Sequence, residues 1–343
     1  MDTLTLTRPD DCHLHLRDGS ALKAVLGDSA RRFARAVVMP NLRPPLTTVA
    51  AVQAYRDRIL AARPAGSDFA PLMTLYLTEA TSARELEAAK AAGIVGVKLY
   101  PAGATTHSDA GVRRVEAVYA QLETMQAIDL PLLVHGEVTD PTVDVFDREA
   151  VFIERHLAPL VAHFPGLRVV LEHVTTREGV EFVRGARPGV AATITPQHLS
   201  MNRGALFEGG LRPHHYCLPV LKREEHRAAV LAAAISGDPK FFLGTDSAPH
   251  PRGDKLSACG CAGIYSAHAG IELYAEAFEQ AGALDRLEAF ASHHGADFYR
   301  LPRNTGTLTL HRAPQAVPDS LPFGDDRLVP LRAGGQVAWR LAE

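Results

Sequence analysis

The sequence predicts an α/β protein, a (β/α)8 TIM barrel followed by a small C-terminal appendage of short strands. Three observations indicate this fold. Eight short runs rich in apolar and β-branched residues recur along the chain. Segments with apolar residues at helical spacing separate these runs. Polar side chains suited to metal binding end several of the runs, where barrel enzymes carry their active sites.

The predicted strands include stretches that are apolar throughout, such as Val37-Val38-Met39 and Val169-Val170-Leu171. Such runs are typical of parallel strands that are covered on both faces. The eight strands are expected at residues 10–16, 34–41, 69–78, 95–101, 130–137, 168–175, 190–199 and 240–250.

The segments between the strands are rich in Ala, Leu, Glu and Arg, which are strong helix formers. Helices are expected over residues 49–62, 83–92, 112–127, 148–164 and 223–235, with N-caps at Thr81-Ser82 and Asp147. After Pro302 the pattern changes to short strands at 307–310 and 337–339. The whole chain, residues 1–343, is expected to form one domain, with the barrel over about 8–300 and the appendage over about 303–343.

Composition favours a small ligand. The chain has 343 residues, a net charge of −3 and no long run of basic residues, which argues against nucleic acid or a membrane as partner. No apolar run approaches the roughly 20 residues of a membrane span, and the first residues lack a signal segment, so a cytoplasmic location is expected. The four cysteines are too few for a disulfide framework, and Cys259-Gly260-Cys261 lacks the second pair of a zinc knuckle.

The most informative segment is 11–19, which reads Asp-Cys-His-Leu-His-Leu-Arg-Asp-Gly. Side chains alternate along a strand, so His13 and His15 are expected to point to one side and to bind one metal ion. The planar guanidinium of Arg17 matches a carboxylate. Taken alone, the histidines could also be ordinary hydrogen-bonded residues, because a metal site needs more than two ligands. The segment suggests a hydrolase that acts on small acids.

The barrel register brings further polar residues to the same end. Because active-site groups lie at the C-terminal ends of barrel strands, side chains that end different strands are expected to meet. These residues are His13 and His15, Asn41, Lys98, His135, His173 and Asp246. Individually, His135 and His173 could be buried histidines bonded to carbonyls, and Asp246 could cap a turn. Together they predict a metal site.

Lys98 lies within the apolar strand Gly96-Val97-Lys98-Leu99-Tyr100, where an unpaired ammonium would be costly. Addition of carbon dioxide to the neutral amine gives a carbamate, whose two oxygens can bridge two cations. The alternative is a lysine that pairs with Asp246 or reaches a phosphate or carboxylate of the substrate. The surrounding histidines favour the bridging carbamate.

These residues resemble the dihydroorotase family of the shorter bacterial type (class II), within the amidohydrolase superfamily. The resemblance covers nearly the whole chain, and its motifs occur in family order. They are His13-Leu14-His15-Leu16-Arg17-Asp18-Gly19, Met39-Pro40-Asn41, Lys98-Leu99-Tyr100-Pro101-Ala102, His135-Gly136-Glu137, Glu172-His173, Leu218-Pro219-Val220-Leu221-Lys222, Gly244-Thr245-Asp246-Ser247-Ala248-Pro249-His250 and Cys259-Gly260-Cys261-Ala262-Gly263.

The resemblance implies two zinc ions per subunit. The implied ligands are His13, His15 and Asp246 for one ion, His135 and His173 for the other, and Lys98, as N6-carboxylysine, bridging them together with a hydroxide. In the hydrolytic direction the hydroxide attacks the ring amide of (S)-dihydroorotate, and Asp246 acts as general acid and base. The product is N-carbamoyl-L-aspartate. The reverse reaction, which closes the ring and releases water, belongs to de novo pyrimidine (UMP) biosynthesis.

The resemblance also assigns the substrate contacts. The implied residues are Arg17, Asn41 and His250 for the carboxylate, His135, and the backbones of Leu218 and Ala262 for the ring. The loop 101–111 is expected to act as a lid, with Thr105 and Thr106 donating hydrogen bonds to the substrate. A homodimer is implied. His198, at the end of the seventh predicted strand, is left outside the site.

Two other functions are considered. A hydantoinase or dihydropyrimidinase would share the metals but would need no carboxylate clamp, so Arg17, Asn41 and His250 argue against it. A non-catalytic partner protein that resembles dihydroorotase would be expected to have lost metal ligands. Every expected ligand is present in this chain.

Overall fold

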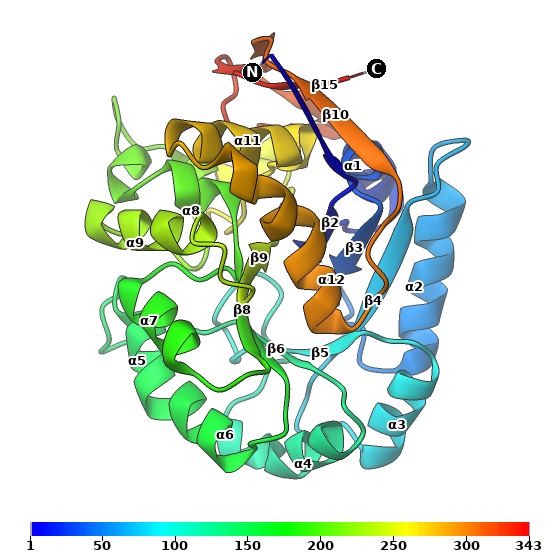
Figure 1. The fold of residues 1–343 in the computed structure, drawn as a ribbon. Coiled ribbons are helices and arrows are strands. Elements are labelled where there is room, and N and C mark those ends of the chain that lie inside the picture. Colours follow the sequence, from blue (N-terminus) through cyan, green and yellow to red (C-terminus); the bar gives the residue numbers. More distant parts are fainter. Residues whose placement is uncertain (1, 343) are drawn as a thin grey trace.

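The structure is a computed structural model that describes residues 2–342. Eight parallel strands pair in sequential order around a barrel (Figure 1). They are β2 (Asp10–Leu14), β3 (Arg35–Val38), β4 (Ala70–Tyr76), β5 (Gly96–Leu99), β6 (Leu132–Val134), β7 (Val169–Leu171), β8 (Val190–Ile194) and β9 (Phe241–Leu243). A parallel bridge between Leu14 and Ser247 joins the first strand to the segment after the last. The predicted (β/α)8 barrel is confirmed.

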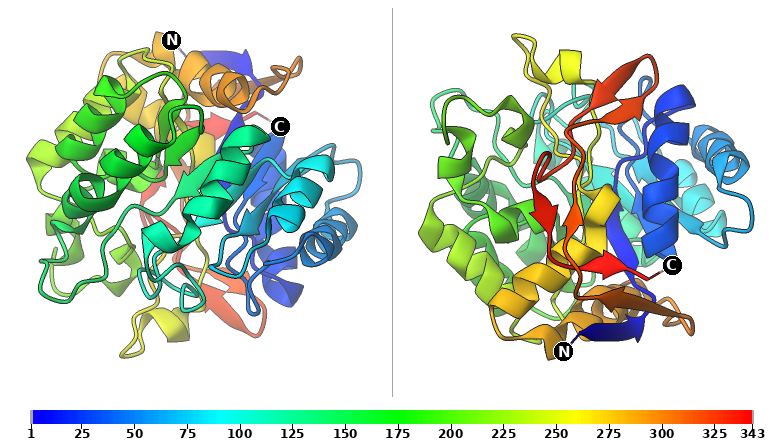
Figure 2. Two further views of the ribbon diagram at one scale, coloured as in Figure 1. Left: turned by 90° about the horizontal axis from the view of Figure 1, so that it is seen from below. Right: turned by 90° about the horizontal axis from the view of Figure 1, so that it is seen from above.

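Helices cover the outside of the barrel (Figures 1 and 2). They are α1 (Gly19–Arg32), α2 (Val49–Ala62), α3 (Ala83–Ala91), α4 (Tyr119–Ala127), α5 (Arg148–Phe152), α6 (Ala158–His163), α7 (Arg177–Gly185), α8 (Pro196–Ser200), α9 (Glu224–Ala234), α10 (Arg252–Lys255), α11 (Gly270–Gln280) and α12 (His294–Tyr299). Two π-helical segments, Ile153–Leu157 and Ala289–His293, precede α6 and α12. Ser82 caps α3 by accepting from the Glu85 N–H, as predicted. Asp147 precedes α5 but makes no side-chain cap.

Several predicted boundaries were wrong. The predicted strand 190–199 ends at Ile194, and α8 begins at Pro196, because Thr195 caps the helix and proline suits a first helical position. The predicted strand 240–250 ends at Leu243, and Asp246 follows in a turn. The sequence reading also missed the helix over Gly19–Arg32, which begins directly after the segment that carries His13 and His15.

The appendage includes the start of the chain, which was not predicted. β1 (Thr3–Thr7) pairs antiparallel with β10 (Thr307–His311), and β15 (Arg340–Leu341) pairs with the other edge of β10 (Figure 1). Two short pairs complete it: β11 (Gln315–Ala316) with β14 (Gln336–Val337), and β12 (Leu321–Phe323) with β13 (Asp326–Leu328). Of the predicted strand 337–339, only Val337 lies in a strand, β14, and Trp339, which is fully buried, lies between β14 and β15.

The buried hydrophobic residues of the described chain form three clusters. The largest lies between the barrel and its helices and continues to Leu310 and Trp339 of the appendage. The smallest cluster consists mainly of single residues from several strands, among them Cys12, Leu133 and Phe242. The pairing of β2 with β3 shifts register between Asp11 and Leu14, next to His13, the first predicted metal ligand. Such irregularities re-aim side chains, so the bulge directs His13 toward the barrel mouth.

Candidate metal centre

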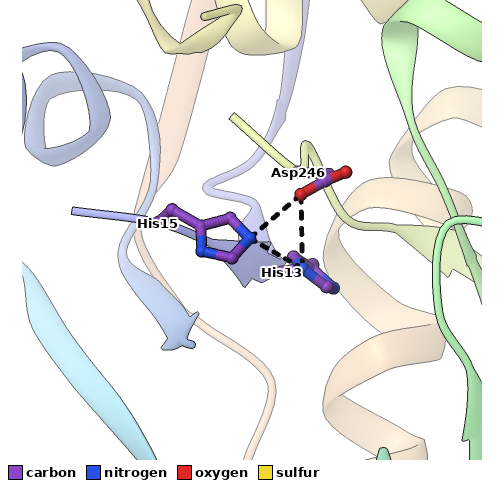
Figure 3. Close-up of side chains that lie close together, drawn as sticks. All are labelled: His13, His15 and Asp246. Carbon is purple, nitrogen blue, oxygen red and sulfur yellow. Dashed lines mark hydrogen bonds and ion pairs between the residues drawn. The ribbon is translucent and has the colours of Figure 1, made fainter. Parts of the chain in front are cut away.

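Three predicted ligands converge at the C-terminal ends of β2 and β9 (Figure 3). The Nε2 atoms of His13 and His15 are 3.3 Å apart. The Oδ1 atom of Asp246 lies 3.1 Å from His15 Nε2 and 3.4 Å from His13 Nε2. All three side chains are buried. Two imidazoles and a carboxylate that face one point form a donor set that suits zinc.

Buried hydrogen bonds fix how these ligands face the site. The His13 Nδ1–H donates to Glu172 Oε2 at 2.7 Å, and the His15 Nδ1–H donates to Asn41 Oδ1 at 2.9 Å. Each bond leaves the lone pair of Nε2 directed at the cluster. Such outer partners set the tautomer and raise the basicity of metal-binding histidines. Glu172 is itself held by the Thr193 hydroxyl, which donates to its Oε2 at 2.6 Å.

The second predicted pair of ligands lies beside this cluster. The ring centroids of His135 and His173 are 4.8 Å apart, and those of His13 and His173 are 5.2 Å apart. The His135 Nε2–H donates to Glu137 Oε2 at 2.7 Å, which leaves Nδ1 free to bind a metal. Thr193 also accepts a hydrogen bond from the His173 backbone N–H at 2.7 Å.

Lys98 is fully buried, and its Nζ has no hydrogen-bond partner anywhere in residues 2–342. The Nζ atom lies 5.1 Å from the centre of the Tyr100 ring. Burial lowers the pKa of Lys98 to about 8, although Glu172 and Asp246 act in the opposite direction. The amine is therefore easier to deprotonate than an exposed lysine, as addition of carbon dioxide requires. A buried amine that has no hydrogen-bond partner and lies among predicted metal ligands fits the predicted bridging carbamate.

The ionisation of the ligands suits a metal. Burial lowers the pKa of His13, and it lowers the pKa values of His15 and His173 well below the usual range. These imidazoles are therefore neutral at pH 7, and neutral imidazole is the form that binds metal ions. Burial raises the pKa of Asp246, and His13 and Lys98 counteract this effect.

Three site residues have left-handed backbone conformations, with φ of 58° at Arg17, 42° at His173 and 45° at Asp246. Such angles cost of order 1–3 kcal/mol in residues other than glycine and require support from the surroundings. Asp11 supplies part of it, because its carboxylate accepts from the backbone N–H groups of His13 at 3.1 Å and Thr245 at 2.8 Å.

The predicted carboxylate clamp lies at the same mouth. Arg17 Nη2 lies 3.0 Å from His250 Nε2, and Arg17 Nε donates to the Pro249 carbonyl at 2.9 Å. His250 Nε2 also lies 3.0 Å from the Ala262 carbonyl. Asn41 contacts His15 and donates from Nδ2 to the Thr106 carbonyl at 3.3 Å. Asn41 thus has a contact with the metal cluster that the sequence reading did not assign.

The predicted lid loop lies over the site. Thr106 donates from Oγ1 to the Ala262 carbonyl at 3.3 Å, and the Thr105 N–H donates to Ser108 Oγ at 2.9 Å. A cavity beneath this loop is lined by every predicted site residue except Lys98 and His250. Its lining residues are His13, His15, Arg17, Asn41, Tyr100, Thr105, Thr106, His135, His173, Leu218, Asp246, Ala248, Ala262 and Gly263.

Residues that the sequence reading missed are mainly buried carboxylates behind the ligands. Glu137 and Glu172 stood in recognised motifs but received no role, and Asp11 was not singled out. Their type was the available signal, because a charged residue next to a histidine in an apolar strand needs a partner. His198 supports the site from outside: its Nδ1 lies 2.7 Å from Thr195 Oγ1, and its Nε2–H donates to the Pro219 carbonyl at 3.1 Å.

Comparison with known proteins defines the class. The model of the amidohydrolase family matches residues 10–325. The chain therefore belongs to the amidohydrolase family of metal-dependent hydrolases. A dihydroorotase of Methylobacillus flagellatus is 67% identical over 342 residues, which is 99% of each protein. Within the family, the chain belongs to the dihydroorotases, which are cyclic amide hydrolases.

Solved structures agree with this grouping. The dihydroorotase of Campylobacter jejuni is 38% identical with a TM-score of 0.92, and the match covers 99% of this chain and 98% of that one. The dihydroorotase of Saccharomyces cerevisiae in complex with 5-fluoroorotic acid is 32% identical with a TM-score of 0.91, covering 100% and 99%. An L-hydantoinase of Arthrobacter aurescens shares the fold, with a TM-score of 0.80 over 99% of this chain and 83% of that one, at 17% identity.

Proposed function

We propose that this chain is a zinc-dependent dihydroorotase that interconverts (S)-dihydroorotate plus water with N-carbamoyl-L-aspartate. The observation that carries the proposal is one cavity whose lining combines two chemically distinct groups of residues. His13, His15 and Asp246 suit a metal. Arg17 suits a carboxylate. Dihydroorotate is a cyclic amide that carries a carboxylate, so it matches both groups.

The residues present fit a binuclear centre. His13, His15 and Asp246 would hold one ion, His135 and His173 the other, and Lys98 as a carbamate would bridge them. Two bound zinc ions lower the pKa of water and polarise an amide carbonyl, which supplies the nucleophile and the electrophile at neutral pH. Glu172 and Glu137 hold the imidazoles of His13 and His135 in the tautomers that binding requires.

Asp246 is the residue that moves the proton. In the hydrolytic direction its carboxylate would take the proton of the attacking hydroxide and transfer it to the ring nitrogen as the C–N bond breaks. In the direction of ring closure the same carboxylate would take the proton from that nitrogen as the C–N bond forms and return it to the departing oxygen.

Arg17 orients the substrate. Two of its five N–H donors are directed at Pro249 and His250 in residues 2–342, which leaves three donors for a carboxylate. The yeast dihydroorotase was solved with 5-fluoroorotic acid, a carboxylic acid, which supports a carboxylate pocket in this family. Thr105 and Thr106 line the same cavity from the lid and would donate to the bound ring while the loop excludes water.

One experiment tests this function against the hydantoinase alternative. The protein is purified, its zinc per chain is measured, and turnover is compared on dihydroorotate, dihydrouracil and hydantoin. We expect two zinc ions and a strong preference for dihydroorotate, because only that ring carries the carboxylate that Arg17 binds. Equal or greater turnover of the rings without a carboxylate would refute the assignment. No turnover of any ring by the zinc-loaded protein would favour the non-catalytic alternative.

Two further parts of the proposal are a homodimer, which the family resemblance implies, and a cytoplasmic location, which the composition of the chain predicts. In the described chain, residues 2–342, no helix has the length and apolarity needed to cross a membrane. Light scattering coupled to size-exclusion chromatography would test the dimer, with a single peak at twice the 37.0 kDa chain mass expected. Fractionation of the producing cells would test the location.

A further inference from the structure

A buried lysine outside the metal centre is hydrogen-bonded only to backbone carbonyls, and its Nζ also lies 5.6 Å from the centre of the Tyr216 ring. Lys255, the last residue of α10, is 4% exposed. Its Nζ donates to the carbonyls of Tyr216 at 2.7 Å, Cys261 at 2.9 Å and Gly263 at 2.9 Å. An ammonium has three N–H donors, so all of them are used. Within residues 2–342, no carboxylate oxygen lies within 4 Å of this Nζ.

The bonded carbonyls belong to the two loops that carry the proposed ring contacts. Tyr216 lies two residues before Leu218, and Cys261 and Gly263 flank Ala262. The Gly263 N–H also donates to the Tyr216 carbonyl at 3.1 Å, so the two loops are joined directly next to the lysine. Both Leu218 and Ala262 line the cavity of the metal centre. Lys255 therefore lies behind the wall that would hold the ring.

Lys255 itself ends α10, which directly follows the segment that carries Asp246 and His250. Its backbone N–H donates to the Pro251 carbonyl at 3.2 Å, directly after His250. His250 in turn lies 3.0 Å from the Ala262 carbonyl. One ammonium thus connects the loop of the proton-transfer group to both loops of the ring wall.

This arrangement is expensive for stability alone. A buried cation without a carboxylate partner loses its hydration, and backbone carbonyls replace it only in part. Burial lowers the pKa of Lys255 to about 8, which agrees with a costly charge. An apolar residue of similar size would fill the same space, but it would leave three carbonyls of two loops without a common hydrogen-bond donor. The lysine instead holds these loops at a fixed position relative to each other.

We propose that Lys255 is a positioning residue that sets the distance between Leu218 and Ala262 and thereby fixes how the substrate ring is held against Asp246. This inference rests on the proposed function, because Leu218 and Ala262 are ring contacts only if the substrate is dihydroorotate. Lys255 acts through the two loops and does not line the cavity beneath the lid. Its loss is expected to weaken ring binding while the metal centre remains intact.

The test compares Lys255→Met, Lys255→Gln and the exposed-lysine control Lys23→Met in the full chain. Each protein is loaded with zinc, zinc per chain is measured, and kcat and KM are determined on dihydroorotate. For Lys255→Met we expect KM to rise at least about tenfold, because several hydrogen bonds to a charged donor are lost. We expect kcat to change less than KM, and zinc per chain to equal that of the wild type. Lys255→Gln keeps two N–H donors but has no charge, so its KM should lie between the KM values of the wild type and of Lys255→Met.

The outcomes separate this inference from the proposed function. If the wild type turns over dihydroorotate and both Lys255 variants keep its KM, the positioning role is wrong. If zinc per chain falls together with activity, Lys255 acts on the metal centre and the inference is also wrong. Should Lys255→Met fail to fold, the KM of Lys255→Gln decides. An inactive, zinc-loaded wild type would overturn the proposed function itself, before any variant is compared.

Discussion

Replacing Arg17 by methionine should destroy substrate preference while leaving the metal centre in place. The guanidinium has five N–H donors, of which Nε donates to Pro249 at 2.9 Å and one on Nη2 faces His250 at 3.0 Å. Two of the remaining three can bind both oxygens of a carboxylate. Each charge-assisted hydrogen bond contributes about 1.5–3 kcal/mol, so the pair contributes roughly 3–6 kcal/mol. This corresponds to a loss of roughly 10²- to 10⁴-fold in kcat/KM on dihydroorotate.

The assay measures kcat/KM for Arg17→Met on dihydroorotate and on dihydrouracil, which lacks the carboxylate. Turnover of dihydrouracil, however slow in the wild type, should change far less, because Arg17 has no carboxylate to bind in that ring. Arg56→Met, an exposed position on α2, is the matched control and should behave like the wild type. If Arg17→Met lost both activities in equal proportion with zinc retained, Arg17 would not be the carboxylate anchor and the reasoning would fail.

Three further predictions concern the metal centre and acid stability. Lys98→Ala should lose activity and bind less zinc, with partial recovery when small carboxylic acids replace the carbamate; full activity without them would refute the bridge. Glu172→Gln should weaken zinc binding about 10- to 100-fold in a chelator titration, because the partner of His13 loses its charge; an unchanged affinity would contradict this role. Burial lowers the pKa of His268 to about 4 from 6.5, so the folded state resists its protonation, and the free energy of unfolding should fall as pH drops from 6.5 toward 4. His268→Phe keeps an aromatic ring against Tyr265 but cannot take up a proton. The fall in the free energy of unfolding between pH 6.5 and pH 4 should therefore be smaller in this variant than in the wild type, by on the order of 3 kcal/mol. Urea unfolding of the two proteins at several pH values measures this difference.

The barrel was predictable because its strands are buried on both faces and therefore appear as apolar runs. Val169–Leu171 is such a case, and the structure places it in β7. Predicted strand ends were wrong where a local side-chain hydrogen bond ends the strand although the apolar sequence continues. Thr195 is an example, because it caps α8 directly after β8. The pairing of β1 with β10 could not be foreseen, because these strands are about 300 residues apart and neither carries a signal that specifies the other.

The ligands were predictable for a related reason. In a barrel the end of every strand lies at one mouth, so residues such as His135 and His173 meet whatever their separation in sequence. The partners of the supporting carboxylates were not predictable, because they depend on which atoms face one another across strands. Glu172 bonds to His13, 159 residues away, although its neighbour in sequence is His173. Lys255 was hidden in the same way, since its partners are backbone carbonyls, which no side-chain motif reveals.

The antiparallel pairing of β1 with β10 has a consequence for the order in which the molecule can fold during synthesis. Thr3 faces His311 in this pair, so the first strand cannot find its partner until nine-tenths of the chain has been made. Until then its edge is open, and an open strand edge is a template for pairing with another chain. Thr3, Thr5 and Thr7 alternate with Leu4 and Leu6, so only one side of the waiting strand is apolar. That alternation limits the surface through which nascent chains could associate before β10 arrives.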